Sequence, residues 1–130
     1  MSAPVITVAA NAFEDDSQRL QRFIGTLTIS PSGAIYPAET GGIPLASVLA
    51  AALSPKSSSN PKALYLTSTL GSGYIYQYIP STQKMQIFLV PPSGSLTTAV
   101  PLQELNSNAG SLVGVAADVI AFDVYYERNT

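Results

Sequence analysis

Acidic residues near the end of the chain are its clearest candidates for acid–base chemistry. Asp118, Asp123 and Glu127 could include a pair of carboxylates of the kind that hydrolyses glycosidic bonds. Asp123 and Glu127, however, share one face of a predicted strand, and four residues of strand separate them by about 13 Å. Two carboxylates so far apart do not flank one bond, and we therefore do not expect a glycosidase.

Two serine–lysine pairs have the spacing of an acyl-transfer motif. They are Ser59 with Lys62 and Ser81 with Lys84. That motif needs a helix that begins at the serine and directs the lysine towards it, together with partner motifs that this chain lacks. Both pairs fall in predicted turns, so we interpret the spacing as coincidence.

The chain lacks most of the other side chains that serve as reactive groups in enzymes. The 130 residues contain no His, no Cys and no Trp, and only 11% of them are charged. The chain therefore has no histidine base, no thiolate, no disulfide and no Cys/His zinc site. We expect neither an enzyme nor a bound cofactor.

The densest group of charges is Glu14, Asp15 and Asp16, followed by Arg19 and Arg22. Three adjacent carboxylates lack the alternating spacing of an EF-hand loop, which argues against a calcium site. We expect instead a solvated turn or a single helical turn, with the acids balanced by the nearby arginines. No metal is expected.

The charge balance also narrows the range of partners. The formal net charge is −2, and the six Lys and Arg residues are scattered along the chain. Nucleic-acid binding requires clustered basic residues, so we expect none. No segment approaches the roughly 20 apolar residues of a membrane span, and the start of the chain lacks the basic region of a signal peptide. We expect synthesis in a reducing cytoplasm and no membrane partner.

Alternating apolar residues predict strands. In residues 23–29, Phe23, Leu27 and Ile29 share one face with Gly25. Near the end of the chain, residues 119–128 alternate in the same way and place four apolar side chains on one face: Ile120, Phe122, Val124 and Tyr126. Further strands are predicted at residues 4–10 and 63–70.

Two more strands, residues 74–79 and 85–90, are joined by Pro80-Ser81-Thr82-Gln83. A four-residue loop would place Tyr74 opposite Leu89, Tyr76 opposite Ile87 and Tyr78 opposite Met85. Such aromatic–aliphatic pairs contribute about 0.2–1 kcal/mol each. We predict that the tyrosine face is directed into the core; a tyrosine-rich binding surface is the alternative.

The only helix predicted is residues 45–53, where Leu45, Val48, Leu49 and Leu53 have helical spacing and Pro55 follows. About eight short strands with turns between them indicate an all-β protein. We predict an antiparallel β-sandwich or barrel, jelly-roll-like, with at most one short helix. The length suits a single domain (residues 1–130), with an extended N-terminal arm over about residues 1–22.

Several segments together resemble a family of viral proteins. The hairpin pattern Gly73-Tyr74-Ile75-Tyr76-Gln77-Tyr78, with Pro80, Lys84 and an apolar strand after it, is similar to small structural proteins of tailed bacteriophages. Residues 116–128 resemble the Ala-rich segment and last strand of those proteins, and residues 26–33 with 41–45 resemble their front half. Two positions differ: Ile79 replaces an Asp, and Gln83 stands where Gly would relieve a left-handed conformation.

The resemblance implies a capsid decoration (cement) protein, located on the exterior of the virion. Such a protein binds the outer surface of the head and bridges neighbouring major capsid subunits, which stabilises the capsid. Its low charge suits broad interfaces, whose centres are depleted in charged residues. We expect self-association, as a homotrimer first and a dimer second.

The capsid contact is expected in the N-terminal arm and the charged stretch after it, at these residues: Val5, Ile6, Val8, Phe13, Arg19 and Arg22. Two alternatives stay open. One is a tail, baseplate or fibre component of the same class of virus. The other is a carbohydrate-binding β-sandwich, with tyrosines as the stacking platform.

Overall fold

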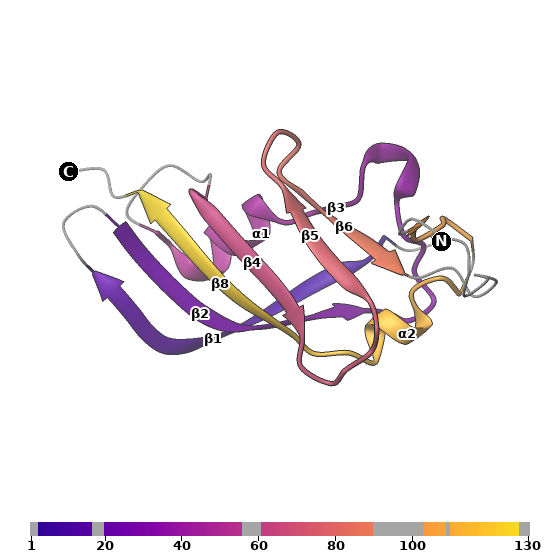
Figure 1. Cartoon of the computed structure of the whole chain (residues 1–130), viewed down its shortest axis with the longest axis horizontal. Helices are drawn as coiled ribbons and strands as arrows, with labels where there is room; N and C mark the ends of the chain where they lie inside the picture. Colours follow the sequence, from indigo (N-terminus) through magenta and orange to yellow (C-terminus); the bar gives the residue numbers. More distant parts are fainter. Residues whose placement is uncertain (1–2, 17–19, 56–60, 90–102, 109, 128–130) are drawn as a thin grey trace, which may run out of the picture.

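The computed structural model describes residues 3–16, 20–55, 61–89, 103–108 and 110–127. Eight strands in this part of the chain form two antiparallel sheets, in a sandwich-like arrangement (Figure 1). The all-β prediction is confirmed. The strands are β1 (Val5–Asp16), β2 (Leu20–Ser30), β3 (Ile43–Pro44), β4 (Ala63–Ser68), β5 (Ile75–Ile79), β6 (Lys84–Leu89), β7 (Gln103–Glu104) and β8 (Ile120–Glu127).

The first sheet has the strand order β1-β2-β8-β4, so the C-terminal strand β8 lies between β2 and β4. In the second sheet, β6 is central. It pairs with β5 along one edge, and with β3 and β7 at different ends of the other edge. The strand predicted at residues 119–128 is confirmed as β8 of the first sheet.

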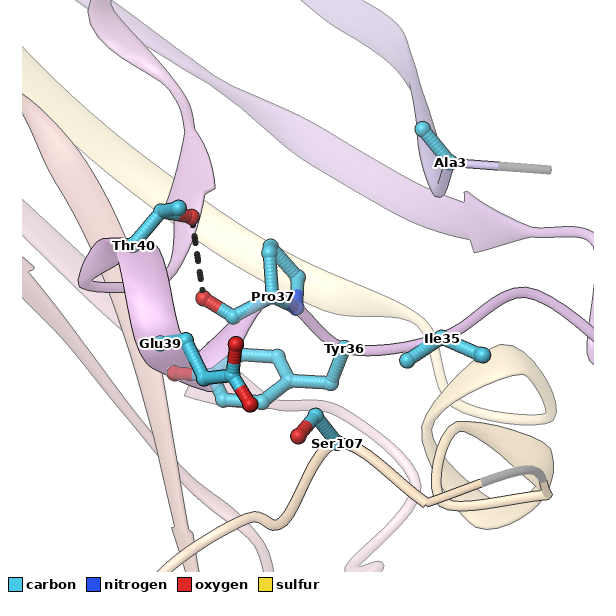
Figure 2. Close-up of a pocket in the computed structure, with 7 residues that line it drawn as sticks. All are labelled: Ala3, Ile35, Tyr36, Pro37, Glu39, Thr40 and Ser107. Carbon is cyan, nitrogen blue, oxygen red and sulfur yellow. Dashed lines mark hydrogen bonds between the residues drawn. The ribbon is translucent and has the colours of Figure 1, made fainter. Parts of the chain in front are cut away.

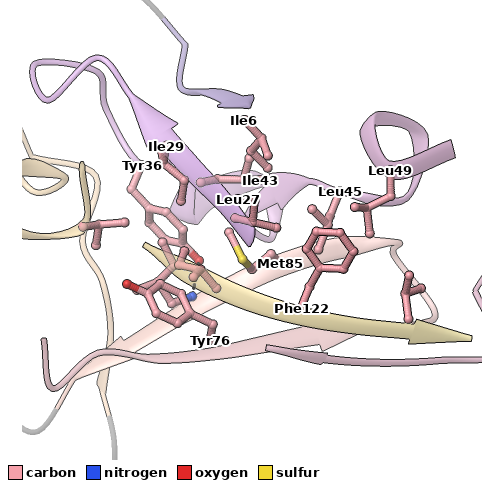
Figure 3. Packing of buried hydrophobic residues seen from close by; sticks show 14 of the residues in the cluster. Ile6, Leu27, Ile29, Tyr36, Ile43, Leu45, Leu49, Tyr76, Met85 and Phe122 are labelled. Atoms are coloured by element: carbon pink, nitrogen blue, oxygen red, sulfur yellow. Dashed lines mark hydrogen bonds between the residues drawn. The ribbon is translucent and has the colours of Figure 1, made fainter. Parts of the chain in front are cut away.

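Apolar side chains from both sheets meet in one core (Figure 3). Along β2, buried residues alternate with half-buried ones, and the buried set includes Phe23, Leu27 and Ile29, as the sequence predicts. Along β8, Ile120, Phe122, Val124 and Tyr126 are all buried. Burial of such side chains stabilises the fold by about 1.5–3 kcal/mol each.

The hairpin of β5 and β6 has the predicted register. Tyr76 lies opposite Ile87 and Tyr78 opposite Met85. Tyr76 is buried, and Tyr74 and Tyr78 pack against the core, which confirms that this face points inward. Gln83 adopts the left-handed conformation, with φ of 62°, at the position where the sequence pattern would favour Gly.

The one predicted helix is α1 (Ala46–Leu53), which buries Leu49 and Leu53; Ser54 caps its C-terminus, just before Pro55. A 3₁₀ turn, η1 (Ala38–Thr40), precedes β3. A single helical turn, α2 (Val113–Ala116), precedes β8.

The expected turn at Glu14, Asp15 and Asp16 is wrong. These residues are the end of β1, and Asp15 lies opposite Arg22 of β2. The register shifts between Ala10 and Glu14, which lets the strand continue past the irregularity. Pairing with β2 thus overrides the local preference of the acidic run, and residues 5–16 form an edge strand of the first sheet.

Candidate functional site

The first sheet turns one side to the core and the other to solvent; we call the latter the outer face. Its residues are the half-buried or exposed ones that alternate with the core residues of each strand and that pair with one another across the strands. Small and hydroxyl-bearing side chains dominate it. The outer face comprises Val5, Thr7, Ala9, Arg22, Ile24, Thr26, Thr28, Ser30, Ala63, Tyr65, Thr67, Ala121, Asp123, Tyr125 and Glu127.

An ion pair lies at one end of the outer face. The Nε of Arg22 donates to Oδ1 of Asp123 at 2.9 Å, and Nη2 donates to Oδ2 at 2.8 Å. The guanidinium also lies over the ring of Tyr125, with Cζ 5.4 Å from the ring centroid. This bidentate geometry holds the two opposite charges together, so the pair adds little net charge to a contact between the outer face and a partner.

Tyr65 projects beside this ion pair and is 65% exposed. It stands directly opposite Asp123 in the pairing of β4 with β8. A shallow recess of about 270 Å³ lies between Tyr65, Thr67 and Arg22. Exposed tyrosines beside arginines are typical of the central contacts in protein interfaces.

A second cluster lies inside the fold, around the carboxylate of Asp118, which is 2% exposed. Four groups donate to it: the hydroxyls of Ser68 and Ser72 at 2.8 Å each, the phenol of Tyr76 at 2.7 Å, and the amide of Val119 at 2.9 Å. These bonds connect the end of β4 and the loop after it to β5 and to the start of β8. The cluster therefore fastens the two sheets together.

The electrostatics of this cluster follow from its geometry. Burial raises the pKa of Asp118, but the hydrogen bonds from Tyr76, Ser68, Ser72 and the Val119 amide outweigh it and hold the pKa below its usual value. Burial and the bond to Asp118 raise the pKa of the Tyr76 phenol. An ionised acceptor surrounded by neutral donors has a structural role, because it is closed to solvent.

A third feature is a recess of about 420 Å³ beside η1, shown in Figure 2. Its described lining includes Tyr36, Thr40, Glu39 and Ser107. The phenol of Tyr36 donates to Glu104 at 2.6 Å, and the Thr40 hydroxyl donates to the carbonyl of Pro37 at 3.2 Å. Two of the polar groups along this recess are thus occupied by bonds within the chain.

The residues considered for catalysis have separate partners in the structure. Lys62 forms an exposed ion pair with Glu127 at 3.5 Å, and Asp123 is bound to Arg22. Lys84 donates to the carbonyl oxygen of Thr40 at 2.5 Å. Ser59 lies outside the described residues. Asp118, Asp123 and Glu127 therefore do not form a common acid–base site.

The six residues expected to contact a capsid are divided between two environments. Val5 is 57% exposed, and it shares the outer face with Arg22. Ile6 is buried and Val8 packs against the core. The side chain of Phe13 and the whole of Arg19 lie outside the described residues. Only Val5 and Arg22 are thus placed by the structure on a surface that a partner can reach.

In the described part of the chain, no three His, Cys, Asp or Glu side chains are grouped as a metal site. None of the helices described is both long and apolar enough to cross a bilayer. No protein-family model, curated protein or solved structure matches the chain.

Sequence reasoning missed the two internal carboxylate contacts, Asp118 with Tyr76 and Glu104 with Tyr36. Their partners lie 42 and 68 positions away in the chain. A lone Asp between the apolar runs at residues 112–117 and 119–122 was the available signal for Asp118. The identity of its donors depends on which strands meet, which no local pattern reveals.

Proposed function

We propose that the protein is a capsid decoration protein, which binds the exterior of a tailed-phage head and bridges neighbouring major capsid subunits. The observation that carries this proposal is the outer face of the first sheet. It is broad and is built mainly from Thr, Ala and Tyr, and the opposite charges of Arg22 and Asp123 on it cancel. A face of this kind favours a protein contact with a weakly charged centre.

Three further features support the proposal, the first two because they favour a role in binding rather than in turnover. The chain has no histidine or cysteine. The buried carboxylate of Asp118 and the half-buried one of Glu104 are both bound by tyrosine phenols within the fold. The hairpin that carries the resemblance to phage structural proteins has the register expected from its pattern.

The proposal implies a major capsid protein encoded in the same genome, and the test is co-sedimentation with heads assembled from that protein. We expect the wild-type protein to sediment with expanded heads. Thr26→Arg puts a charge at the centre of the outer face, between Ala9 and Ala121, and should weaken binding at least tenfold. The matched control is Gln77→Arg on β5, an exposed position of the second sheet, which should bind like the wild type.

Circular dichroism establishes that both variants are folded before they are compared. Failure of the folded wild-type protein to bind heads would refute the proposal. Labelling of tails instead of heads in negative-stain images would favour the tail or baseplate alternative.

A carbohydrate-binding role is the second candidate, favoured by one observation. Tyr65 offers an exposed ring next to the hydrogen-bonding groups of Arg22, Asp123 and Thr67, along the 270 Å³ recess. Sugars stack their C–H faces on aromatic rings and use such polar groups for their hydroxyls. Tyr76 is buried and bonded to Asp118, so Tyr65 is the residue to test. Glycan-array binding that Tyr65→Ala abolishes would support this role.

A further inference from the structure

The first sheet ends in an edge strand, β1, that is longer than any other described strand. Among the described strands it pairs with β2 alone, along one of its two edges. Strand edges present unpaired N–H and C=O groups, and proteins usually protect them with charges, bulges, prolines or short strands. The two halves of β1 differ in this respect.

The second half of β1 carries such protection. The register shift follows Ala10, and Glu14, Asp15 and Asp16 come after it. The first half, residues 5–10, is Val-Ile-Thr-Val-Ala-Ala and has neither a charge nor a proline. It is also regularly paired with β2 from Val5 to Ala10, so no register shift interrupts the edge that another strand would join.

We infer that this edge, Val5–Ala9, pairs with the same edge of a second copy, antiparallel and about a two-fold axis through Thr7. The two-fold axis must be perpendicular to the sheet, so residues on one face of a copy meet residues on the same face of its partner. Val5 then lies opposite Ala9 of the second copy, Ile6 opposite Val8, and Thr7 opposite Thr7.

These pairs are complementary in size and chemistry. Val5, one of the exposed large apolar side chains, meets a small alanine. Ile6 and Val8 form an aliphatic pair on the core side, and the two threonines form a pair that commonly stabilises adjacent strands. A register centred on Val8 would instead place Val5 opposite residue 11, inside the irregular segment.

Pro4 and the acidic residues 14–16 limit the ladder between the two copies to residues 5–9. Pro4 has no N–H to donate, so the pairing ends just before Val5. In the register centred on Thr7, the acidic residues 14–16 of the two copies lie beyond both ends of the ladder. No like charges face each other across the axis.

The pairing concerns the protein free in solution and does not depend on the proposed function. Were both correct, the two outer faces would join in one continuous sheet of eight strands, a surface broad enough to reach two neighbouring subunits. The dimer is the second of the two assemblies that the sequence led us to expect.

A single cysteine tests the register directly, since the chain has none of its own. Opposite residues of antiparallel strands have Cα atoms about 4.5–5.5 Å apart, which a disulfide can span. Thr7→Cys should therefore give a covalent dimer under mild oxidation. Thr28→Cys is the matched control: it lies beside Thr7 on β2, and about 14 Å would separate the two copies of residue 28. We expect it to cross-link at least tenfold more slowly.

A charge swap provides the second measurement. Thr7→Lys and Thr7→Glu each place like charges on the axis, and each should run as a monomer in light scattering. An equimolar mixture of the two should recover the dimer, at twice the 13.6 kDa chain mass. Thr67→Lys, on the opposite edge strand of the sheet, should remain dimeric like the wild type.

A wild-type protein that is monomeric or trimeric at micromolar concentration would overturn the inference. Equal cross-linking of the two cysteine variants, or a mixture of the charged variants that stays monomeric, would do the same. Head binding by a monomeric wild type would leave the proposed function standing while this inference failed.

Discussion

The phenol of Tyr76 donates a 2.7 Å hydrogen bond to Oδ2 of Asp118, from one sheet to the segment that leads into β8, an inner strand of the other sheet. With Ser68, Ser72 and the Val119 amide, it surrounds this carboxylate with donors only. Asp118→Asn would therefore place an amide N–H₂ among donors. We expect the free energy of unfolding to fall by about 2–3 kcal/mol.

Urea denaturation at pH 7, followed by circular dichroism, measures this loss. Asp123→Asn serves as the comparison. Because the side chains of Asp123 and of its partner Arg22 are both partly solvated, this substitution should lower the free energy of unfolding by at most about 1 kcal/mol. Equal losses in the two variants would contradict a structural role for the Asp118 cluster.

The Asp118 carboxylate should also make the free energy of unfolding depend on pH in the acidic range. The pKa of Asp118 in the folded protein lies below its usual value near 3.8. Its contribution to stability is therefore complete above about pH 5 and is lost as the pH falls past 3.8 and through the folded-state pKa. The difference in unfolding free energy between the wild type and Asp118→Asn should narrow steadily from pH 5 to pH 3. A difference that stays constant over that range would exclude Asp118 as the source.

Replacing a buried tyrosine by phenylalanine should affect stability differently at Tyr76 and at Tyr126. The Tyr76 phenol donates to Asp118, whereas the Tyr126 hydroxyl is buried without a hydrogen-bond partner in the described structure. Tyr76→Phe should cost about 1–2 kcal/mol, and Tyr126→Phe should be neutral or stabilise by up to about 1 kcal/mol. Thermal and urea unfolding of the two variants provide the comparison; destabilisation by Tyr126→Phe as large as that by Tyr76→Phe would be the contrary result.

Alkaline titration checks the second tyrosine independently. Burial, and then the neighbouring Tyr78, raise the pKa of Tyr126 to about 12. Since the folded-state pKa exceeds the usual value near 10, the stability linked to Tyr126 is complete below pH 10 and declines between pH 10 and 12. Tyr126→Phe should lose less stability than the wild type over this range.

The elements that the sequence predicted well are those governed by local patterns. A period of two along β2 and β8 fixed their buried faces, and a four-residue loop fixed the register of β5 with β6, because a slip of one residue would have moved every tyrosine to solvent. The leucine spacing and Pro55 placed α1 to within one residue.

What the sequence did not predict depends on contacts between distant segments. The acidic residues 14–16 resemble a turn when taken alone, but their pairing with β2 keeps them in a strand. Asp123 is close to Arg22 only because β8 inserts beside β2, 101 positions away in the chain. The outer face, which carries the proposed function, arises from the strand order and has no signature in any one segment.

The Arg22–Asp123 pair allows a double-mutant cycle. Its geometry is bidentate, but both side chains are about one-third exposed, so water screens the attraction. We expect a coupling energy of about 0.5–1 kcal/mol from Arg22→Ala, Asp123→Ala and the double variant, which decreases in 1 M salt. Arg22→Lys keeps the charge but loses the two-point geometry, and should retain less than half of the coupling. A coupling that high salt leaves unchanged would argue against an electrostatic origin.

Gly42 is the position where the backbone itself demands glycine. Its φ is +114°, and an added Cβ would lie 2.3 Å from the carbonyl oxygen of Met85, where β3 approaches β6. Gly42→Ala should therefore destabilise the protein by about 2–4 kcal/mol, because neither the backbone oxygen nor the left-handed conformation can readily adapt. Gly33→Ala is the matched control, since nothing lies within 4 Å of its added Cβ, and it should change stability by less than about 1 kcal/mol. Urea unfolding of both variants decides the point: similar small effects would mean that the β3–β6 contact yields without cost, and that β3 is not held against β6 as tightly as the structure places it.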